Sequence, residues 1–294
     1  MKKKKSVKKK RAKATKSKKN KVLRKSAVKT KSRIKKTRRH RNLKKIISKT
    51  KRKLKRIRRP ATKKKIGRIK SGNVKFDKLI KGGFEPGSTN LIIGGNGSGK
   101  TIFAMQFLIE GIKRGENVLY ITFEEEKEDF YQNMLKIGWD LAKMEKTGKF
   151  TFLEYSPEKI KIMLDEGGGT IEGIVIKKKI KRMVIDNLSS FSMLFKDDSS
   201  KRQNVSALFD IIKKWDCTTF LTFQLNSDED KEEESIVEIQ ADSLIMLHFD
   251  KIKGKRKRTI EVLKMRGTDH STDTYIFDIG KNGIKLEGKI RKSK

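Results

Sequence analysis

From residue 67 onwards, apolar residues occur in two kinds of segment. Short apolar runs bounded by Gly, Asn and charged residues are typical of buried β-strands, whereas longer segments repeat apolar residues at helical spacing. The two kinds alternate, which predicts an α/β fold with a mostly parallel central sheet flanked by helices on both faces. The expected strands are 89–93, 117–123, 150–153, 182–185 and 218–223, and the expected helices are 100–114, 127–137, 171–180 and 201–215.

The alternation of expected strands and helices ends after residue 239, where apolar runs follow one another without helices between them. Residues 242–249 and 258–265 predict a β-hairpin joined by the basic turn 251–257. Residues 275–279 and 283–286 predict a second hairpin across Lys281 and Asn282. We therefore expect C-terminal β-hairpins after the α/β part.

A glycine-rich loop follows the first expected strand and precedes the first expected helix. Residues 94–101, GGNGSGKT, match the phosphate-loop pattern G-x-x-x-x-G-K-[ST] at every fixed position. Glycines let backbone N–H groups turn towards a phosphate, while Lys100 reaches the β- and γ-phosphates and the Thr101 hydroxyl ligates Mg²⁺. The alternative is a glycine-rich turn without a ligand. The expected nucleotide-binding residues here are Gly95, Asn96, Gly97, Ser98, Gly99, Lys100, Thr101 and Ile102.

A second acid for the metal is expected at the end of strand 182–185. Asp186 follows an apolar run, and a strand beside the phosphate-loop strand would point its terminal carboxylate at the Mg²⁺. The alternative is an Asp that caps a turn together with Asn187. The phosphate loop favours the metal role.

The expected catalytic base lies in Glu124-Glu125-Glu126, at the carboxyl end of strand 117–123. Open α/β sheets bind ligands at the carboxyl ends of their strands, so one or two of these glutamates are expected to face the γ-phosphate. The alternative is an acidic start of the next helix, where the helix dipole favours Glu. Composition does not separate the two.

The positive charge of the chain is concentrated in residues 1–65. This segment holds 36 of the 76 Lys and Arg residues and no acid, which leaves 40 basic against 35 acidic residues elsewhere, a net charge of +5. We expect a low-complexity, largely disordered basic tail over 1–65 and a globular domain over 66–294.

Such a tail is expected to bind nucleic acid without sequence preference and in a salt-dependent way. Its lack of aromatic residues argues against base stacking. The alternative partner is an anionic membrane surface, contacted by residues 43–58, where apolar residues recur among basic ones at loosely helical spacing.

The cellular location follows from what the sequence lacks. No apolar run is long enough for a transmembrane helix or a signal peptide. The single cysteine, Cys217, lies in an apolar run and is expected to pack as a small buried hydrophobe. We therefore expect a cytoplasmic protein.

Taken together, the motifs resemble those of KaiC-like ATPases of the RecA superfamily. The resemblance covers about residues 66–287, with one module where KaiC has two in tandem. It implies a RecA-like P-loop NTPase fold, ATP as the nucleotide, Mg²⁺ as the cofactor, and a homo-oligomeric ring, usually a hexamer, with ATP between subunits. The segments that carry it are 76–88 (FDKLIKGGFEPGS), 107–111 (FLIEG), 120–125 (YITFEE), 138–141 (GWDL), 184–188 (VIDNL) and 264–270 (KMRGTDH).

The resemblance also implies roles for single residues. By similarity, Glu124 is the general base that activates water, and Glu125 supports it. Lys264 and Arg266 reach the nucleotide of the neighbouring subunit, although without the resemblance they would be a basic strand end. The other residues implied are Met265, Thr268 and His270 beside these cations, and Gln224, which resembles the γ-phosphate-sensing Gln of RecA-type recombinases.

The sequence therefore predicts a ring-forming, Mg²⁺-dependent ATPase that is regulatory or DNA-associated. One alternative is a nucleotide-gated assembly scaffold that does not hydrolyse ATP, against which the Glu124-Glu125 pair argues. Another is a recombinase-like DNA repair paralogue. The loop 227–234 contains six acids and one Lys, which would repel DNA in a ring channel and is expected to attract the basic tail instead.

Overall fold

The structure is a computed structural model that describes residues 67–156, 158–159, 162, 169–195, 197–225, 237–252 and 254–290. The basic tail over 1–65 and the acidic loop over 227–234 lie outside the described residues, so the expectations about both stay predictions. Within the described part, no helix is long and apolar enough to cross a membrane.

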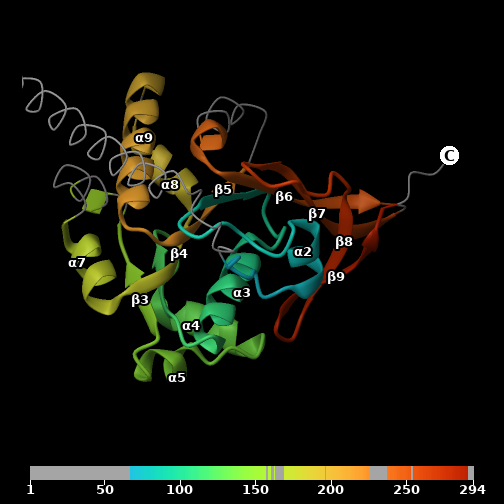
Figure 1. Cartoon of the computed structure of the whole chain (residues 1–294), viewed down its shortest axis with the longest axis horizontal. Coiled ribbons are helices and arrows are strands. Elements are labelled where there is room, and N and C mark those ends of the chain that lie inside the picture. Colours follow the sequence, from blue (N-terminus) through green and yellow to red (C-terminus); the bar gives the residue numbers. More distant parts are fainter. Residues whose placement is uncertain are drawn as a thin grey trace, which may run out of the picture. The chain divides into compact units, whose positions relative to one another are not determined.

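Nine strands form one sheet in the described part, in the order β3-β2-β4-β5-β1-β6-β7-β8-β9 (Figure 1). The strands from β3 to β6 in this order are parallel, and β6, β7, β8 and β9 are antiparallel neighbours. This confirms the α/β fold class with C-terminal hairpins. The strands are β1 (Thr89–Gly94), β2 (Asn117–Thr122), β3 (Phe150–Glu154), β4 (Ile180–Asp186), β5 (Thr218–Gln224), β6 (Ser243–Ile252), β7 (Lys255–Met265), β8 (Tyr275–Gly280) and β9 (Gly283–Lys289).

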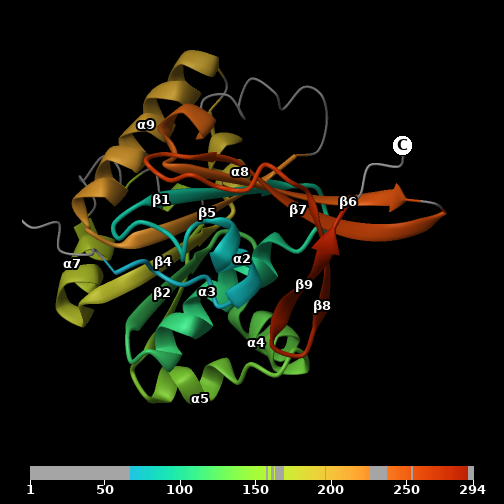
Figure 2. The same ribbon diagram turned by 45° about the vertical axis from the view of Figure 1, so that its right-hand side comes forward.

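Helices cover both faces of the sheet, because side chains of the buried strands alternate between two cores. In β1, Leu91 and Ile93 join the core beneath α7, α8 and α9, whereas Ile92 joins the core beneath α2, α3, α4 and α5 (Figures 1 and 2). The helices are α2 (Val74–Leu79), α3 (Lys100–Lys113), α4 (Lys127–Lys136), α5 (Leu141–Lys146), α7 (Gly169–Lys178), α8 (Leu188–Ser192) and α9 (Asp198–Lys214).

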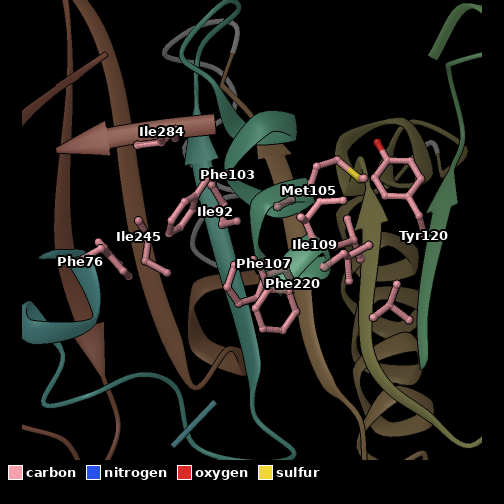
Figure 3. Packing of buried hydrophobic residues seen from close by; sticks show 14 of the residues in the cluster. Phe76, Ile92, Phe103, Met105, Phe107, Ile109, Tyr120, Phe220, Ile245 and Ile284 are labelled. Carbon is pink, nitrogen blue, oxygen red and sulfur yellow. The ribbon is translucent and has the colours of Figure 1, made fainter. Parts of the chain in front are cut away.

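Aromatic side chains fix α3 on the sheet (Figure 3). Phe107 of α3 stacks on Phe220 of β5, with ring centroids 3.9 Å apart and an interplanar angle of 7°. Phe103 and Phe84 add further ring contacts to Phe220. Because α3 directly follows the glycine-rich loop, this packing fixes the loop relative to the strand ends.

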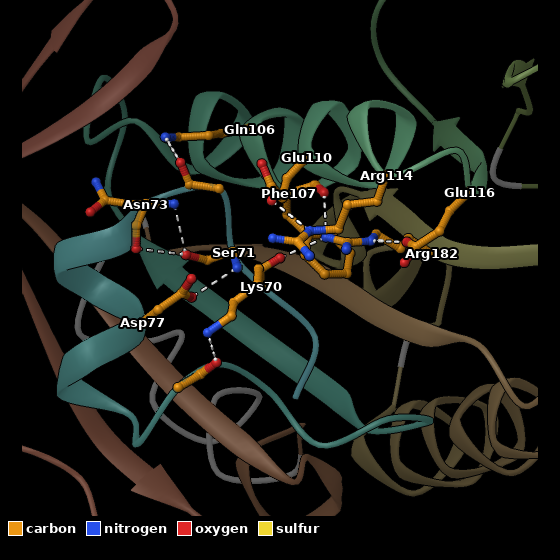
Figure 4. Close-up of polar contacts among 12 residues, drawn as sticks. Lys70, Ser71, Asn73, Asp77, Gln106, Phe107, Glu110, Arg114, Glu116 and Arg182 are labelled. Atoms are coloured by element: carbon orange, nitrogen blue, oxygen red, sulfur yellow. Dashed lines mark hydrogen bonds and ion pairs between the residues drawn. The ribbon is translucent and has the colours of Figure 1, made fainter. Parts of the chain in front are cut away.

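A buried arginine ties the start of the domain to the same helix (Figure 4). Arg182 of β4 is 1% exposed and pairs with Glu116 at 2.5 Å. Its guanidinium also donates to the carbonyl oxygens of Lys70 (2.6 Å) and Phe107 (2.9 Å). These contacts join the segment before α2, the middle of α3 and the strand that ends at Asp186.

The structure departs from the expected elements in three places. The short helices α2, α5 and α8 were not predicted, because each is too brief to show a helical period. The strands β6 and β7 continue through most of the expected basic turn, so that the connection is much shorter than 251–257. Finally, β6 pairs in parallel with β1, which makes the hairpins a continuation of the main sheet.

Candidate nucleotide-binding site

The glycine-rich loop between β1 and α3 has a backbone that side chains would disrupt. Gly97 and Gly99 have φ of 71° and 102°, in the left-handed region that favours glycine. At Gly94, an added Cβ would lie 2.3 Å from the backbone oxygen of Leu247 in β6. The glycines of the motif are therefore needed for the shape of the loop.

The start of α3 offers donors to an anion. No side chain caps its N-terminus at Gly99, so the first backbone N–H groups are available to a ligand and the helix dipole favours negative charge there. The Ser98 hydroxyl is buried and has no hydrogen-bond partner within the described residues. The N–H groups at the start of α3 and the nearby Ser98 hydroxyl together form a set of donors that fits a phosphate group.

Lys100 places a cation inside the loop. Its Nζ donates to the carbonyl oxygens of Gly94 (2.8 Å) and Gly95 (3.1 Å). Burial lowers the pKa of Lys100, while the negative charges of Asp186 and Glu124 oppose that shift. A phosphate in the loop could accept from this ammonium in place of the two carbonyls.

Asp186 lies at the carboxyl end of β4 and accepts hydrogen bonds from three hydroxyl groups. Its Oδ2 accepts from Thr101 (2.7 Å) and Tyr120 (2.8 Å), and its Oδ1 accepts from Thr222 (2.5 Å). Burial, and next the charge of Asp186, raises the pKa of Tyr120 well above its usual value, so the phenol remains a donor. The carboxylate is thereby fixed beside Thr101, the arrangement expected of a Mg²⁺ site.

One detail of the Asp186 prediction is wrong. The strand that carries it is not beside the phosphate-loop strand, because β5 lies between β4 and β1. The carboxylate still reaches Thr101, because Thr101 lies at the start of α3, which packs against β4. Tyr120 and Thr222 were not predicted, because their only signal in the sequence is a polar atom within an otherwise apolar strand.

The first two of the three successive glutamates enter the site. Glu124 is exposed and accepts a hydrogen bond from the Ser190 hydroxyl, and Glu125 is partly buried. Burial, and next the charges of Asp186 and Glu124, raises the pKa of Glu125. The backbone N–H groups of both glutamates donate to Thr122 Oγ1, at 3.2 and 3.1 Å. Glu126 is the N-cap residue of α4, outside the pocket.

A pocket of about 390 Å³ unites these groups. Two of its residues, Arg258 and Ile279, come from the C-terminal strands and were not predicted, because no local pattern links them to a loop so distant in sequence. Arg258 Nε donates to the carbonyl oxygen of Gly97 at 2.9 Å. The lining residues are Asn96, Gly97, Gly99, Lys100, Thr101, Ile102, Thr122, Glu124, Glu125, Asp186, Asn187, Gln224, Arg258 and Ile279.

The cations implied by the family resemblance lie elsewhere. Met265 pairs with Ser243, which pairs with Asn90 near the beginning of β1, whereas the pocket is at the opposite end of that strand. Lys264 donates to the carbonyl oxygen of Glu238 at 2.7 Å. Arg266 pairs with Asp242 (3.5 Å) and donates to the carbonyl oxygen of Ile239 (2.7 Å), and His270 Nδ1 lies 3.1 Å from the Ser271 carbonyl oxygen. The Thr268 hydroxyl is buried without a partner among the described residues.

The fold and the site together define a RecA-like P-loop nucleotide-binding protein. A family model described as the KaiC ATPase matches residues 69–290. The chain belongs to the KaiC family of ATPases.

Similar proteins and a similar crystal structure agree with this assignment. The chain is 35% identical over 230 residues to circadian clock protein KaiC3 of Synechocystis, covering 75% of this chain but 46% of that protein. It is 32% identical over 234 residues to a UPF0273 protein of Thermotoga maritima, covering 75% and 96%. The crystal structure of KaiC-like protein PH0186 from Pyrococcus horikoshii is similar with a TM-score of 0.67 and 34% identity, covering 76% of this chain and 99% of that chain.

Proposed function

We propose that this protein binds MgATP in the pocket at the carboxyl ends of the strands and hydrolyses it. The observation that carries the proposal is the convergence of three groups on that pocket: the Lys100 ammonium, the Thr101–Asp186 pair at 2.7 Å and the two glutamates after β2. Phosphoryl transfer to water requires these parts: a cation that binds phosphate, ligands for the metal and a carboxylate base.

Each part has a defined task in the proposed reaction. The loop N–H groups and Lys100 bind the β- and γ-phosphates, and Mg²⁺ is held by Thr101 with Asp186 beside it. Glu124 accepts the proton of the attacking water, and Glu125 supports it from its less exposed position. Gln224, at the end of β5, lies in the lining where it can contact the γ-phosphate.

The proposed assembly is a homo-oligomeric ring, a hexamer by family resemblance. Within one chain, Lys264 and Arg266 lie at the end of the sheet opposite the pocket, about 13 Å along β1 from its carboxyl end. They can therefore act on a nucleotide only in a neighbouring subunit, with Met265, Thr268 and His270 in the same segment. A cation supplied across an interface would couple hydrolysis to assembly.

Nucleic acid is the proposed partner of the basic tail. The support is composition alone, 36 Lys and Arg and no acid over residues 1–65. Counterion release makes such binding strong at low salt and insensitive to sequence. The tail would thus hold the ATPase domain near a polyanion.

Nucleotide binding to single-site variants tests the pocket. Lys100→Ala should weaken ATP binding at least tenfold, because a charge-assisted contact to phosphate is lost. The matched control, Lys113→Ala, removes an exposed lysine from the end of the same helix and should leave the Kd unchanged. Equal affinity for both variants, measured by calorimetry with MgATP, would mean that the nucleotide does not bind in this loop.

A further inference from the structure

The hairpin of β6 and β7 extends beyond the sheet as a two-stranded ribbon. β6 pairs with β1 only as far as Leu247, and β7 pairs with β8 only from Arg258 to Ile260. The pairing of β6 with β7 continues to Ile252 and Lys255. The described residues between these limits, with Arg258 at their base, are here named the basic ribbon, which projects away from the helices in both views (Figures 1 and 2).

One face of the basic ribbon carries cations and an aromatic ring but no acid. Alternate residues of a strand share a face, and so do residues directly opposite each other in the pair. Phe249 is opposite Arg258, and Lys251 is opposite Arg256. Asp250, the acid of the ribbon, is opposite Lys257 on the other face.

The cations of this face are not neutralised within the described residues. Lys251 and Arg256 are exposed and form no ion pair there. Like charges directly opposite each other destabilise a strand pair, so folding alone does not favour this arrangement. An external polyanion would remove the repulsion.

Contacts to Phe249 hold the two guanidinium groups in place. Those of Arg256 and Arg258 lie 5.6 and 4.3 Å from the centre of its ring, and Arg256 also donates to the Phe249 carbonyl oxygen at 2.8 Å. Such cation–π contacts reduce the side-chain freedom that binding would otherwise have to restrict. Since Arg258 also bonds to Gly97, the ribbon begins at the phosphate loop.

We propose that the basic ribbon is a contact site for the phosphate backbone of duplex DNA, separate from the basic tail. The major groove of B-form DNA admits a two-stranded β-ribbon, whereas the major groove of duplex RNA is too narrow. The exposed cations Lys251 and Arg256 lie on the acid-free face of such a ribbon, one on each strand, and would displace counterions from the phosphates. DNA would then be held directly beside the nucleotide pocket.

Lysine footprinting on the full-length chain separates the ribbon from the tail. The probe is a random-sequence duplex of DNA, and acetylation rates are measured by mass spectrometry with and without it. Lys251 should react several-fold more slowly with DNA, Lys255 and Lys257 on the opposite face should be slowed less, and the exposed Lys143 and Lys146 of α5 should not change. Protection of tail lysines with an unchanged Lys251 would overturn the proposal, and so would equal protection of Lys251 by duplex RNA.

A charge exchange gives a second, independent readout. Lys251→Glu with Arg256→Glu should weaken DNA binding and reduce the slope of log K against log salt by about 2, or about 1 for each lost phosphate contact. The control, Lys143→Glu with Lys146→Glu, makes the same change in net charge on α5. The same slope in both variants, with ATP binding and thermal unfolding intact, would show that DNA is bound by the tail alone.

Discussion

At the scale of single residues, the candidate site is held together by hydroxyl groups around one carboxylate. Asp186 accepts from Thr101, Tyr120 and Thr222, which come from α3, β2 and β5. A buried charge is stable only when such donors satisfy it. The sequence predicted the carboxylate and Thr101 from motif chemistry, but it could not show that β2 and β5 would bring a phenol and a second threonine to the same atoms.

Glu125 gives a pH-dependent prediction. Its pKa is raised above 4.5 by burial and next by Asp186 and Glu124, so the folded state disfavours its charged form. Its contribution to stability is complete below pH 4.5 and is lost as the pH rises through the higher folded-state value. Glu125→Gln should therefore unfold at a higher temperature than the unchanged protein at pH 8, and this difference should vanish near pH 4.

The control for this experiment is Glu128→Gln, which changes an exposed glutamate in the first turn of α4. At pH 8 its unfolding temperature should be unchanged or slightly lower, because Gln loses only the small favourable interaction of an exposed Glu with the helix dipole, and near pH 4 it should be unchanged. A Glu125→Gln variant that is less stable than the unchanged protein at pH 8 would mean that the folded state does not disfavour the charged form of Glu125.

At the scale of elements, the junction between β1 and the phosphate loop requires a glycine, which has no side chain. A Cβ at Gly94 would lie 2.3 Å from the Leu247 backbone oxygen of β6, and a backbone atom cannot move aside as a flexible side chain can. The parallel pairing of β6 with β1 creates this constraint. It could not be predicted from sequence, where residues 242–249 appear only as half of a hairpin.

Gly94→Ala tests this constraint. Overpacking of this kind should lower the free energy of unfolding by about 1–3 kcal/mol, measured by urea denaturation. The matched control is Gly173→Ala in α7, where an added Cβ meets nothing within 4 Å and should raise stability by about 0.5–1 kcal/mol. Equal effects of the two substitutions would mean that β6 does not approach β1 as closely as described.

The elements that were predicted well are those with a clear apolar run, for the strands, or a helical repeat of apolar residues, for the helices. The central strands and the helices α3, α4, α7 and α9 have ends within a few residues of those expected. The pocket residues Arg258 and Ile279 depend on how the C-terminal strands continue the sheet, for which the sequence carries no local signal. Local patterns thus predict elements and motifs, while contacts between distant segments require the fold.

At the scale of the whole molecule, the proposed ring makes each site a product of two subunits. In this proposed ring, one subunit would supply the pocket, and the other would supply Lys264 and Arg266 from the opposite end of its sheet. In a mixed ring, a defective pocket and a defective cation segment can therefore lie on different subunits, so that some interfaces keep both parts intact. This is not possible if the pocket and the cations act only within one chain.

Mixing two inactive variants tests this arrangement. Lys100→Ala lacks a working pocket, and Arg266→Ala lacks the cation proposed to act on the neighbour. Mixed rings contain interfaces at which an intact pocket meets an intact Arg266, so phosphate release should recover to a substantial fraction of the unchanged activity. No recovery after exchange of subunits, with mixed assembly confirmed by native mass spectrometry, would mean that Arg266 does not act between subunits.

The most direct test of ATP hydrolysis is steady-state phosphate release from MgATP by the unchanged protein and by Glu124→Gln. We predict measurable turnover in the unchanged protein, and in the variant a loss of at least about a hundredfold with ATP still bound, because general base catalysis contributes about 10²–10⁴. Glu128→Gln is the control and should turn over normally. If the unchanged protein binds MgATP but releases no phosphate, the hydrolysis proposal is contradicted and the protein acts as a nucleotide-gated assembly scaffold.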